Sequence, residues 1–575
     1  MKISLRIFFG CILLAGLFSK DAWAVPSPPP LPAGQDLEAQ AERFQQEYST
    51  EKREQEEQLK KLTIQVEEEK EKKVPPGPVF ILKGINVTGS TIFNPSQLAF
   101  VWKPYLGKKV DLRSINHIVA MVKRVYTDLG YLTTTAYLPP QDVSNGVVEI
   151  RVVEGKRGNL TVEGNKYFST PSIEKYFHTY RGETMDMGEV QKDLMRLNSN
   201  QDLSVISVLS PGEEPETVDV TLKATENLPY HVSVGEDNQG SRLTGTYRTL
   251  FTVDDSNLTG NHDNLSINTV ITELSSGESA SYQTPVGTNG AKMGLDAGYF
   301  EATLGKEYRS YDIINKTTFF TPNASWELYQ SQDMQADLTS GVRIKDIKKT
   351  QMGTKITDED LSIPYVGLNL IKSDSMGQTA FDPELSFGTP DFLGSSTGDN
   401  PSASRLHADR FFAKYSQYVS RTQKMPFDSY LQIISQFQYA SHTLPTAEQF
   451  QLGGEGSVRG FPQGDYLADI GGDMDTEWYF PMYPIPASWT LFHSDVNLRH
   501  QIEPFIFYDL GGGKLVETYS GETKGEFLQG LGTGIKIHLK NNFYLKMEWG
   551  IPVGGTKPIH GTGPSTFDVS VQAGT

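Results

Sequence analysis

The stretch FYLKMEWGI, residues 543–551, alternates between two kinds of side chain at every position. The apolar set is Phe543, Leu545, Met547, Trp549 and Ile551. The set between them is Tyr544, Lys546, Glu548 and Gly550. Successive side chains of an extended strand point to opposite faces, so this stretch predicts a strand with one apolar face and one wet face.

The same period of two continues through residues 230–575, for example in GIKIHLK at 534–540. A soluble β-sandwich also alternates, but about 350 residues is large for one sandwich. Divided into about 16 strands, the region leaves about 22 residues for each strand and its loop, which suits membrane-spanning strands. Charged inner residues such as Lys546 and Glu548 favour a wet lumen over a dry core. The region therefore predicts an all-β transmembrane barrel of about 16 antiparallel strands.

An internal repeat precedes this region. INVTGSTIF at 85–93 and LTVEGNKYF at 160–168 share one pattern of apolar residues, valine, glycine and phenylalanine. Each is followed by a helical stripe and by a closing strand, VVEIRVVEG at 147–155 and VDVTLKATE at 218–226. A repeat of about 75 residues predicts two copies of one small α/β module. We place these modules at 79–155 and 156–229.

The N-terminal segment has the composition of an export signal. Lys2 and Arg6 accompany a short apolar run that ends in Ala22-Trp23-Ala24, which predicts a signal peptide over 1–24. Residues 25–78 comprise a proline-rich linker and a charged helical stretch at 36–73. This stretch predicts a solvated, partly frayed helix.

Composition argues against several functions. The net charge is −18, from 70 acidic and 52 basic residues, which disfavours a nucleic-acid partner. The only cysteine, Cys11, lies in the predicted signal peptide, so the mature chain would have no disulfide. The catalytic and nucleotide-binding motifs that we sought are absent, and the ten histidines are scattered. GDMDTE at 472–477 is weakly calcium-like and fits a strand start better. We expect no enzyme activity, no metal and no cofactor.

The glycine-rich stretch GGEGSVRGFPQGDY, residues 453–466, carries one arginine, Arg459, between a valine and a glycine. In an ordinary surface loop this arginine would be solvated. The alternative is a loop whose purpose is to position it. The local sequence does not decide between the two.

The first module carries motifs that resemble those of a known family. VYTDLGYLTTTAYLPPQDVSNGVVEIRVVEG, residues 125–155, contains a Tyr-x-x-x-Gly-Tyr pattern and a Leu-Pro-Pro-Gln pattern. These patterns resemble the first POTRA domain of the two-partner secretion transporters, the TpsB family. The motif residues are Tyr126, Gly130, Tyr131, Leu138, Pro139, Pro140 and Gln141. The second module is similar to the second POTRA domain of that family.

Two further motifs extend the resemblance into the barrel region. Val458, Arg459, Gly460 and Phe461 match the motif of the long sixth extracellular loop of the family. Phe507, Asp509 and Gly511 match a motif of a later strand. The resemblance implies that a loop at 448–466 folds back into the lumen and that Arg459 meets Asp509 there. We expect Phe505 and Phe507 to make the wall locally apolar and to hold Phe461, and Glu477 to be a possible second acid near Arg459.

The resemblance implies an outer-membrane transporter of a Gram-negative bacterium, with its POTRA domains in the periplasm. It also implies a possible plug for the pore in the helical stretch at 36–73. The transporter would capture one large, unfolded secreted partner of the adhesin or haemolysin class and move it to the surface without nucleotide hydrolysis. Other expected partners are outer-membrane lipids and the barrel-assembly machinery, and the expected state is a monomer or weak dimer. The alternatives are a barrel-assembly insertase of the same superfamily and a general diffusion porin.

Overall fold

The computed structural model describes residues 79–574, apart from 397–401, 406–407, 409–410, 487, 491–496, 519–521, 540–542, 560–562 and 564. The predicted signal peptide, linker and charged helix of residues 1–78 lie outside the described part. Among the described residues, no helix is long and apolar enough to cross a membrane.

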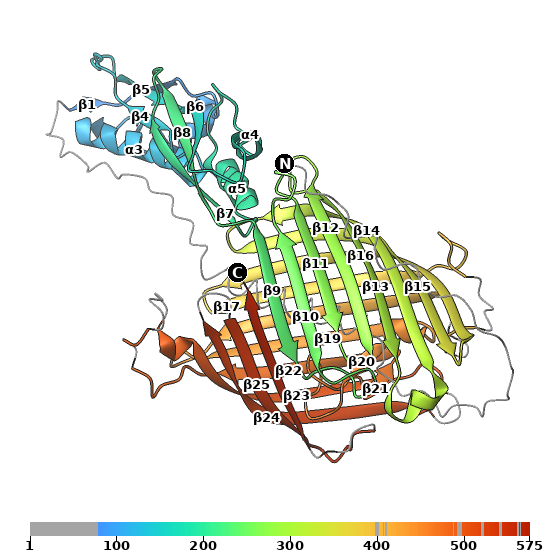
Figure 1. Cartoon of the computed structure of the whole chain (residues 1–575). Coiled ribbons are helices and arrows are strands. Elements are labelled where there is room, and N and C mark those ends of the chain that lie inside the picture. The colour runs from blue at the N-terminus through green and yellow to red at the C-terminus, as the bar shows by residue number, and fades with distance from the viewer. Residues whose placement is uncertain are drawn as a thin grey trace. The chain divides into compact units, whose positions relative to one another are not determined.

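The C-terminal region forms a closed barrel of 16 strands (Figure 1). The strands are β9 (Tyr230–Asp237), β10 (Arg248–Asp255), β11 (Asn264–Ile271), β12 (Ser275–Pro285), β13 (Lys292–Thr303), β14 (Ile313–Gln330), β15 (Met334–Gln351), β16 (Thr354–Asp374), β17 (Gly377–Gly388), β18 (Phe412–Lys424), β19 (Tyr430–Ala440), β22 (Ile470–Tyr479), β23 (Ile502–Lys514), β24 (Gly525–Leu539), β25 (Phe543–Pro552) and β26 (Thr566–Gly574). Neighbours in the ring are antiparallel, and β26 closes it by pairing with β9. The predicted all-β barrel is confirmed.

The two faces of each strand differ as the alternation predicted. In β25, Glu548 and Gly550 are buried inside the barrel, whereas Trp549 between them is 47% exposed on the outside. In β23, Phe505, Phe507 and Asp509 are buried and the residues between them face outward. The inner face is therefore the one that carries charges.

The two N-terminal modules have the same topology. The first contains β1 (Phe80–Ile81), β2 (Gly84–Thr88), α2 (Pro95–Leu98), the 3-10 turns η1 (Ala99–Val101) and η2 (Lys103–Tyr105), β3 (Lys109–Val110), α3 (Leu112–Asp128), β4 (Thr135–Tyr137) and β5 (Val147–Val153). The second contains β6 (Lys156–Glu163), α4 (Thr170–Glu174), α5 (Met187–Leu197), β7 (Leu203–Pro211) and β8 (Thr217–Glu226). The sheet orders are β2-β5-β4 and β6-β8-β7, so in each module the last strand is central.

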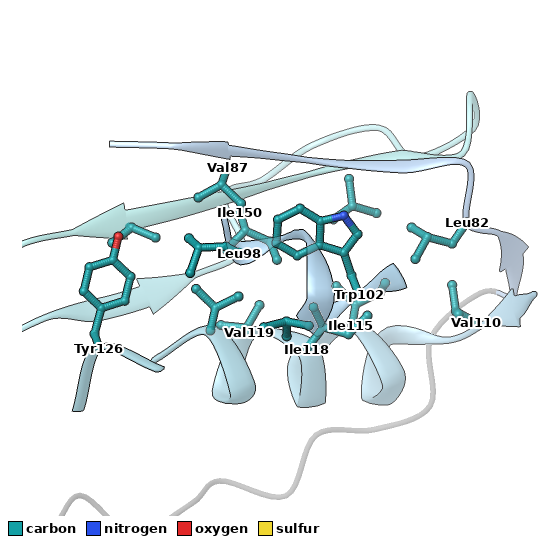
Figure 2. Close-up of a cluster of buried hydrophobic side chains, with 14 residues drawn as sticks. Leu82, Val87, Leu98, Trp102, Val110, Ile115, Ile118, Val119, Tyr126 and Ile150 are labelled. Carbon is teal, nitrogen blue, oxygen red and sulfur yellow. The ribbon is translucent and has the colours of Figure 1, made fainter. Parts of the chain in front are cut away.

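Each module has its own apolar core between the sheet and its longer helix. Figure 2 shows Ile115, Ile118 and Val119 of α3 pointing toward Val87 and Ile150 of the sheet. The helix starts at Asp111, whose side chain accepts a hydrogen bond from the backbone N–H of Ser114 at 2.9 Å. Such an N-cap satisfies one of the free donors at the helix start. In the second module, Asp186 caps α5 in the same way.

The path of the chain shows at which end of the barrel each connection between strands lies. Residues 227–229 join β8 to β9, so β9 starts at the end of the barrel where the second module is attached. Connections that follow odd-numbered strands of the ring then lie at the opposite end. The connection from β19 to β22 follows the eleventh strand and belongs to that far end.

Candidate functional site

The long connection from β19 to β22, residues 441–469, turns into the barrel, and we call it the lumen loop. Within it, β20 (Phe450–Leu452) and β21 (Tyr466–Ala468) form a small hairpin whose six residues are all buried. Val458 is 0% exposed and Arg459 is 3% exposed. Burial also extends outward to Leu444 and Asp469, so the inserted segment is longer than the predicted 448–466.

Arg459 binds the carboxylate of Asp509 on β23 in a bidentate arrangement. Its Nε donates to Oδ2 at 2.7 Å and its Nη2 donates to Oδ1 at 2.6 Å. The backbone N–H of Arg459 also donates to Oδ2, at 3.0 Å. A planar guanidinium suits this geometry because its N–H groups match the two carboxylate oxygens. The pair fixes both the side chain and the backbone of the loop.

Two more acids reach the same arginine. Nη1 of Arg459 donates to Glu548 of β25 at 3.0 Å and contacts Glu477 of β22. Lys546 of β25 lies 3.3 Å from Glu548, 3.6 Å from Glu477 and 3.2 Å from Glu455 of the loop. We call Arg459, Asp509, Glu477, Glu548 and Lys546 the tip cluster. The sequence predicted Glu477 as an acid near Arg459, and it predicted Glu548 and Lys546 to face the lumen but not to belong to this cluster.

Aromatic rings complete one side of the tip cluster. The guanidinium carbon of Arg459 lies 3.6 Å from the ring centroid of Phe507, close enough for a cation–π interaction. A Cβ on Gly532 would lie 2.3 Å from Cζ of Phe507, and one on Gly534 would lie 2.4 Å from Cζ of Phe505. The alternating glycines of GLGTG, residues 530–534, therefore leave room for these rings. This signal was present in the sequence and was not used.

Close backbone contacts seat the loop on the wall. Gly460 has φ +93°, a conformation that favours glycine, and a Cβ there would lie 2.7 Å from the carbonyl carbon of Ile551. A Cβ on Gly530 would lie only 2.1 Å from the carbonyl oxygen of Arg459. A Cβ on Gly511, part of the β23 motif, would lie 2.9 Å from Val458. Glycines on both sides of this contact make it possible.

The predicted partner of Phe461 was wrong. Phe461 is 1% exposed and belongs to an apolar cluster made by the loop itself and Leu528 of β24. The other members are Phe450, Leu452, Val458, Tyr466 and Ala468. Phe505 and Phe507 belong to a separate cluster with Tyr479. Arg459, and not Phe461, contacts the aromatic wall at Phe507. Phe461 packs against the hairpin of its own loop.

Removing one member of the Arg459–Asp509 pair would leave a buried charge without its main counter-charge. Such a loss typically costs about 3–5 kcal/mol, more than the net stability that an intact pair provides. The pair therefore acts mainly as a positional lock, because alternative loop positions leave Asp509, which is 0% exposed, uncompensated.

The Leu-Pro-Pro-Gln motif of the first module closes a sheet edge. Beyond β4, which ends at Tyr137, the chain runs through Pro139 and Pro140, which have no N–H to offer to β5. The side chain of Gln141 replaces them: its Nε2 donates to the carbonyl of Glu149 at 2.7 Å, and its Oε1 accepts from the N–H of Glu149 at 2.6 Å. Leu138 packs against the core of the module.

The Tyr-x-x-x-Gly-Tyr motif lies at the end of α3. Tyr126 is fully buried, and its hydroxyl bonds to Ser90 at 2.6 Å and to Glu154 at 3.2 Å. Burial raises the pKa of Tyr126 to about 12, so this hydroxyl stays protonated. Gly130 turns the chain with φ +95°, and Tyr131 packs edge-on to Tyr126 at 6.4 Å. The motif therefore ends the helix and holds it on the sheet.

Comparison with known proteins agrees with these features. The model of the haemolysin secretion/activation protein ShlB/FhaC/HecB matches residues 216–537, more than half of the chain. The chain belongs to this family. The ShlB-type POTRA domain also matches, at residues 80–155. The protein is thus a two-partner secretion transporter of the outer membrane, and it acts with a secreted partner protein.

Alignments with similar transporters cover most of the chain. The heme/hemopexin transporter protein HuxB of Haemophilus influenzae is 24% identical over 481 residues, covering 80% of each chain. The outer membrane transporter CdiB of Dickeya dadantii is 26% identical over 403 residues, covering 67% of this chain and 69% of CdiB. The structure of CdiB from Escherichia coli superposes with a TM-score of 0.74 at 21% identity, covering 93% of this chain and 98% of CdiB.

The family assignment identifies which end of the barrel faces the periplasm and which faces the cell surface. The POTRA domains of this transporter are periplasmic, so β9 starts at the periplasmic end. The lumen loop is the sixth connection at the other end and enters the transporter from the cell surface.

The second POTRA domain of the transporter has a much longer edge strand than the first domain. β7 is nine residues long and pairs with β8 along its whole length, whereas β4 of the first domain has three residues. A side chain covers Val205 of this edge: Asn198 accepts from the N–H of Val205 at 2.6 Å and donates to its carbonyl at 3.0 Å. In an antiparallel pair every second residue faces the edge, so Ser207 and Leu209 face it too. Among the described residues, no backbone group outside β8 bonds to either of them.

The calcium-like stretch GDMDTE lies within β22, as the interpretation as a strand predicted. In the described part of the chain, no group of histidine, cysteine or acidic residues has a geometry that could hold a metal ion.

Proposed function

We propose that this transporter captures a large, unfolded partner of the adhesin or haemolysin class in the periplasm and threads it through the barrel to the surface. The observation that supports this proposal best is the lumen loop, which occupies the barrel and is held there by the tip cluster. A simple diffusion pore does not need such a removable obstruction. The barrel-assembly machinery would insert the protein among outer-membrane lipids. The transporter itself would work as a monomer or weak dimer.

The capture step uses strand addition at β7. An edge strand presents unpaired N–H and C=O groups that an extended peptide can bind. Among the described residues, no backbone group bonds to the outer edge of β7 at Ser207 or Leu209, and Ile206 and Val208 are 43% and 38% exposed on the adjoining face. In the first domain, the edge strand β4 has only three residues, and beyond it Gln141 occupies the backbone groups of Glu149 on β5. The partner would therefore pair with the second domain.

Translocation requires the lumen loop to move. The bound partner would displace the loop, and the emerging chain would fold outside the cell. Folding on one side only supplies direction, since a folded β-helical chain cannot return through the barrel. The tip cluster would restore the closed position after each passage.

A comparison of the surface and medium proteins of cells with and without this gene tests the whole proposal. We expect the loss of one or two very large surface or secreted proteins, with other outer-membrane barrels unchanged. Broad loss of many barrels would instead indicate an insertase and would refute the proposed direction and cargo. A steadily open pore in single-channel recordings would favour a porin.

A proline at position 209 tests the capture step in the full-length protein. The N–H of Leu209 faces the open edge, so Leu209→Pro removes a donor needed by an added strand and leaves the β7–β8 bonds in place. We expect normal insertion and export reduced several-fold, measured as secreted partner per barrel in the membrane. Export equal to that of the unmodified protein would exclude strand addition at this edge.

A further inference from the structure

A second ionic contact holds the lumen loop far from its tip. Glu448 ends the 3-10 turn η4 (Thr446–Glu448) and is 4% exposed. Its carboxylate lies 3.1 Å from Nζ of Lys345 on β15 and 2.5 Å from Nζ of Lys414 on β18. The carbonyl of Glu448 also accepts from Nε2 of Gln438 on β19, at 3.0 Å. One acid therefore joins the loop to three strands.

One of these strands, β15, lies across the barrel from β25 of the tip cluster, whereas β19 is the direct neighbour of β22. Counting around the closed ring from β15, β22 is the fifth strand, β23 the sixth and β25 the eighth. In a ring of 16 strands, β15 and β25 therefore face each other. Lys345 binds the base of the loop on one wall, and Glu548 binds its tip on the other. The segment from Glu448 to Arg459 crosses the lumen between them.

Apolar packing accompanies the base contact. Leu444 of the loop is 0% exposed and packs with Ile347, Ile363 and Phe412 of the same wall. At the end of the loop, the carboxylate of Asp469 accepts from Nη1 of Arg405, which lies in the connection between β17 and β18, at 2.9 and 3.1 Å. The base of the loop is thus fixed to this wall independently of Arg459.

We infer that Glu448 is a second anchor, a positioning residue that stretches the lumen loop across the barrel and so keeps the pore narrow until a partner enters. The inference rests on the proposed role of the loop as a removable obstruction. Its physical basis is that a loop held at only one wall can swing aside, whereas a loop held at two facing walls must cross the space between them. The carboxylate of Glu448 contacts both Lys345 and Lys414, so one loop side chain joins two strands of this wall.

Planar-bilayer recordings of the full-length protein without partner test this anchor. Glu448→Lys places a third cation beside Lys345 and Lys414, so the base of the loop should detach. We expect the mean current at fixed voltage to rise several-fold through longer open periods. Adding Lys345→Glu and Lys414→Glu reverses all three charges and should return the current toward that of the unmodified protein. Glu301→Lys is the matched control, because Glu301 pairs with Lys316 on the exposed outside of the barrel.

Insertion of each variant is measured by its heat-dependent migration on a gel. If Glu448→Lys does not insert, Glu448→Gln replaces it, and a smaller rise in current is expected. An unchanged current in an inserted Glu448 variant, or no recovery on full charge reversal, would overturn the second anchor. This failure is distinct from failure of the proposed function, which would show as unchanged export in cells that lack the gene.

Discussion

The tip and the base of the lumen loop are held by ion clusters of opposite construction. At the tip, Arg459 is a loop cation that meets three acids from three wall strands. At the base, Glu448 is a loop acid that meets two wall lysines. The tip also has a tight backbone fit at Gly460, whereas the contacts at the base are ionic and apolar. The tip is therefore redundant in counter-charge but specific in shape, whereas at the base one carboxylate, that of Glu448, contacts both wall lysines.

The largest effect is expected from Arg459→Ala. It leaves Asp509, Glu477 and Glu548 facing one another with only Lys546 nearby, which should cost about 3–5 kcal/mol in loop anchoring. We expect normal insertion and export lowered by at least about tenfold, since 1.4 kcal/mol already corresponds to tenfold. The measurement is secreted partner per inserted barrel. Full export by this variant would contradict the assigned role of the tip.

Charge exchange at the tip should give partial recovery. Arg459→Asp with Asp509→Arg restores one opposite-charge pair, so export should rise above that of either single variant. Recovery should remain incomplete, because Glu477 and Glu548 would then face a loop carboxylate instead of a cation. Export no better than in the single variants would show that the two residues do not act as a direct pair.

Shape at the tip can be tested without changing charge. Gly530→Ala would place a Cβ 2.1 Å from the carbonyl oxygen of Arg459, so the loop or the wall must shift. Overpacking of this kind costs about 1–3 kcal/mol. We expect a few-fold loss of export and a higher bilayer current. Gly84→Ala is the control, because a Cβ there meets nothing within 4 Å.

The smallest effect is expected from Glu477→Gln. Arg459 keeps its bidentate bond to Asp509 and its bond to Glu548, so export should fall less than twofold. Glu448→Gln removes the carboxylate that contacts both Lys345 and Lys414, and it should raise the bilayer current more than Glu477→Gln does. The opposite ranking would overturn the contrast between the redundant tip and the base.

Much of the fold was readable from the sequence because its signals are local. The alternation in 543–551 depends only on neighbouring residues, and so does the apolar stripe of α3 from Ile115 to Tyr126. The family resemblance implied that Arg459 meets Asp509, and the structure brings the two together. Glu477 was named because it lies close to the loop along the chain.

The remaining contacts follow from closure of the barrel. Lys345 is more than 100 residues from Glu448, and no local pattern pairs them; the ring of strands does. Glu548 reaches Arg459, and Lys546 reaches Glu477, because β25 lies close to β22 and β23 in that ring. The glycines of β24 acquire their role only when the register sets Gly532 opposite Phe507.

The strands, the two modules and the motif that carries Arg459 follow from local sequence, because side-chain periodicity and turn residues act over a few positions. The wall that each end of the lumen loop binds is set by the closed barrel instead. That choice depends on strand order, register and inward parity together, and these become defined when β26 pairs with β9 and the barrel closes.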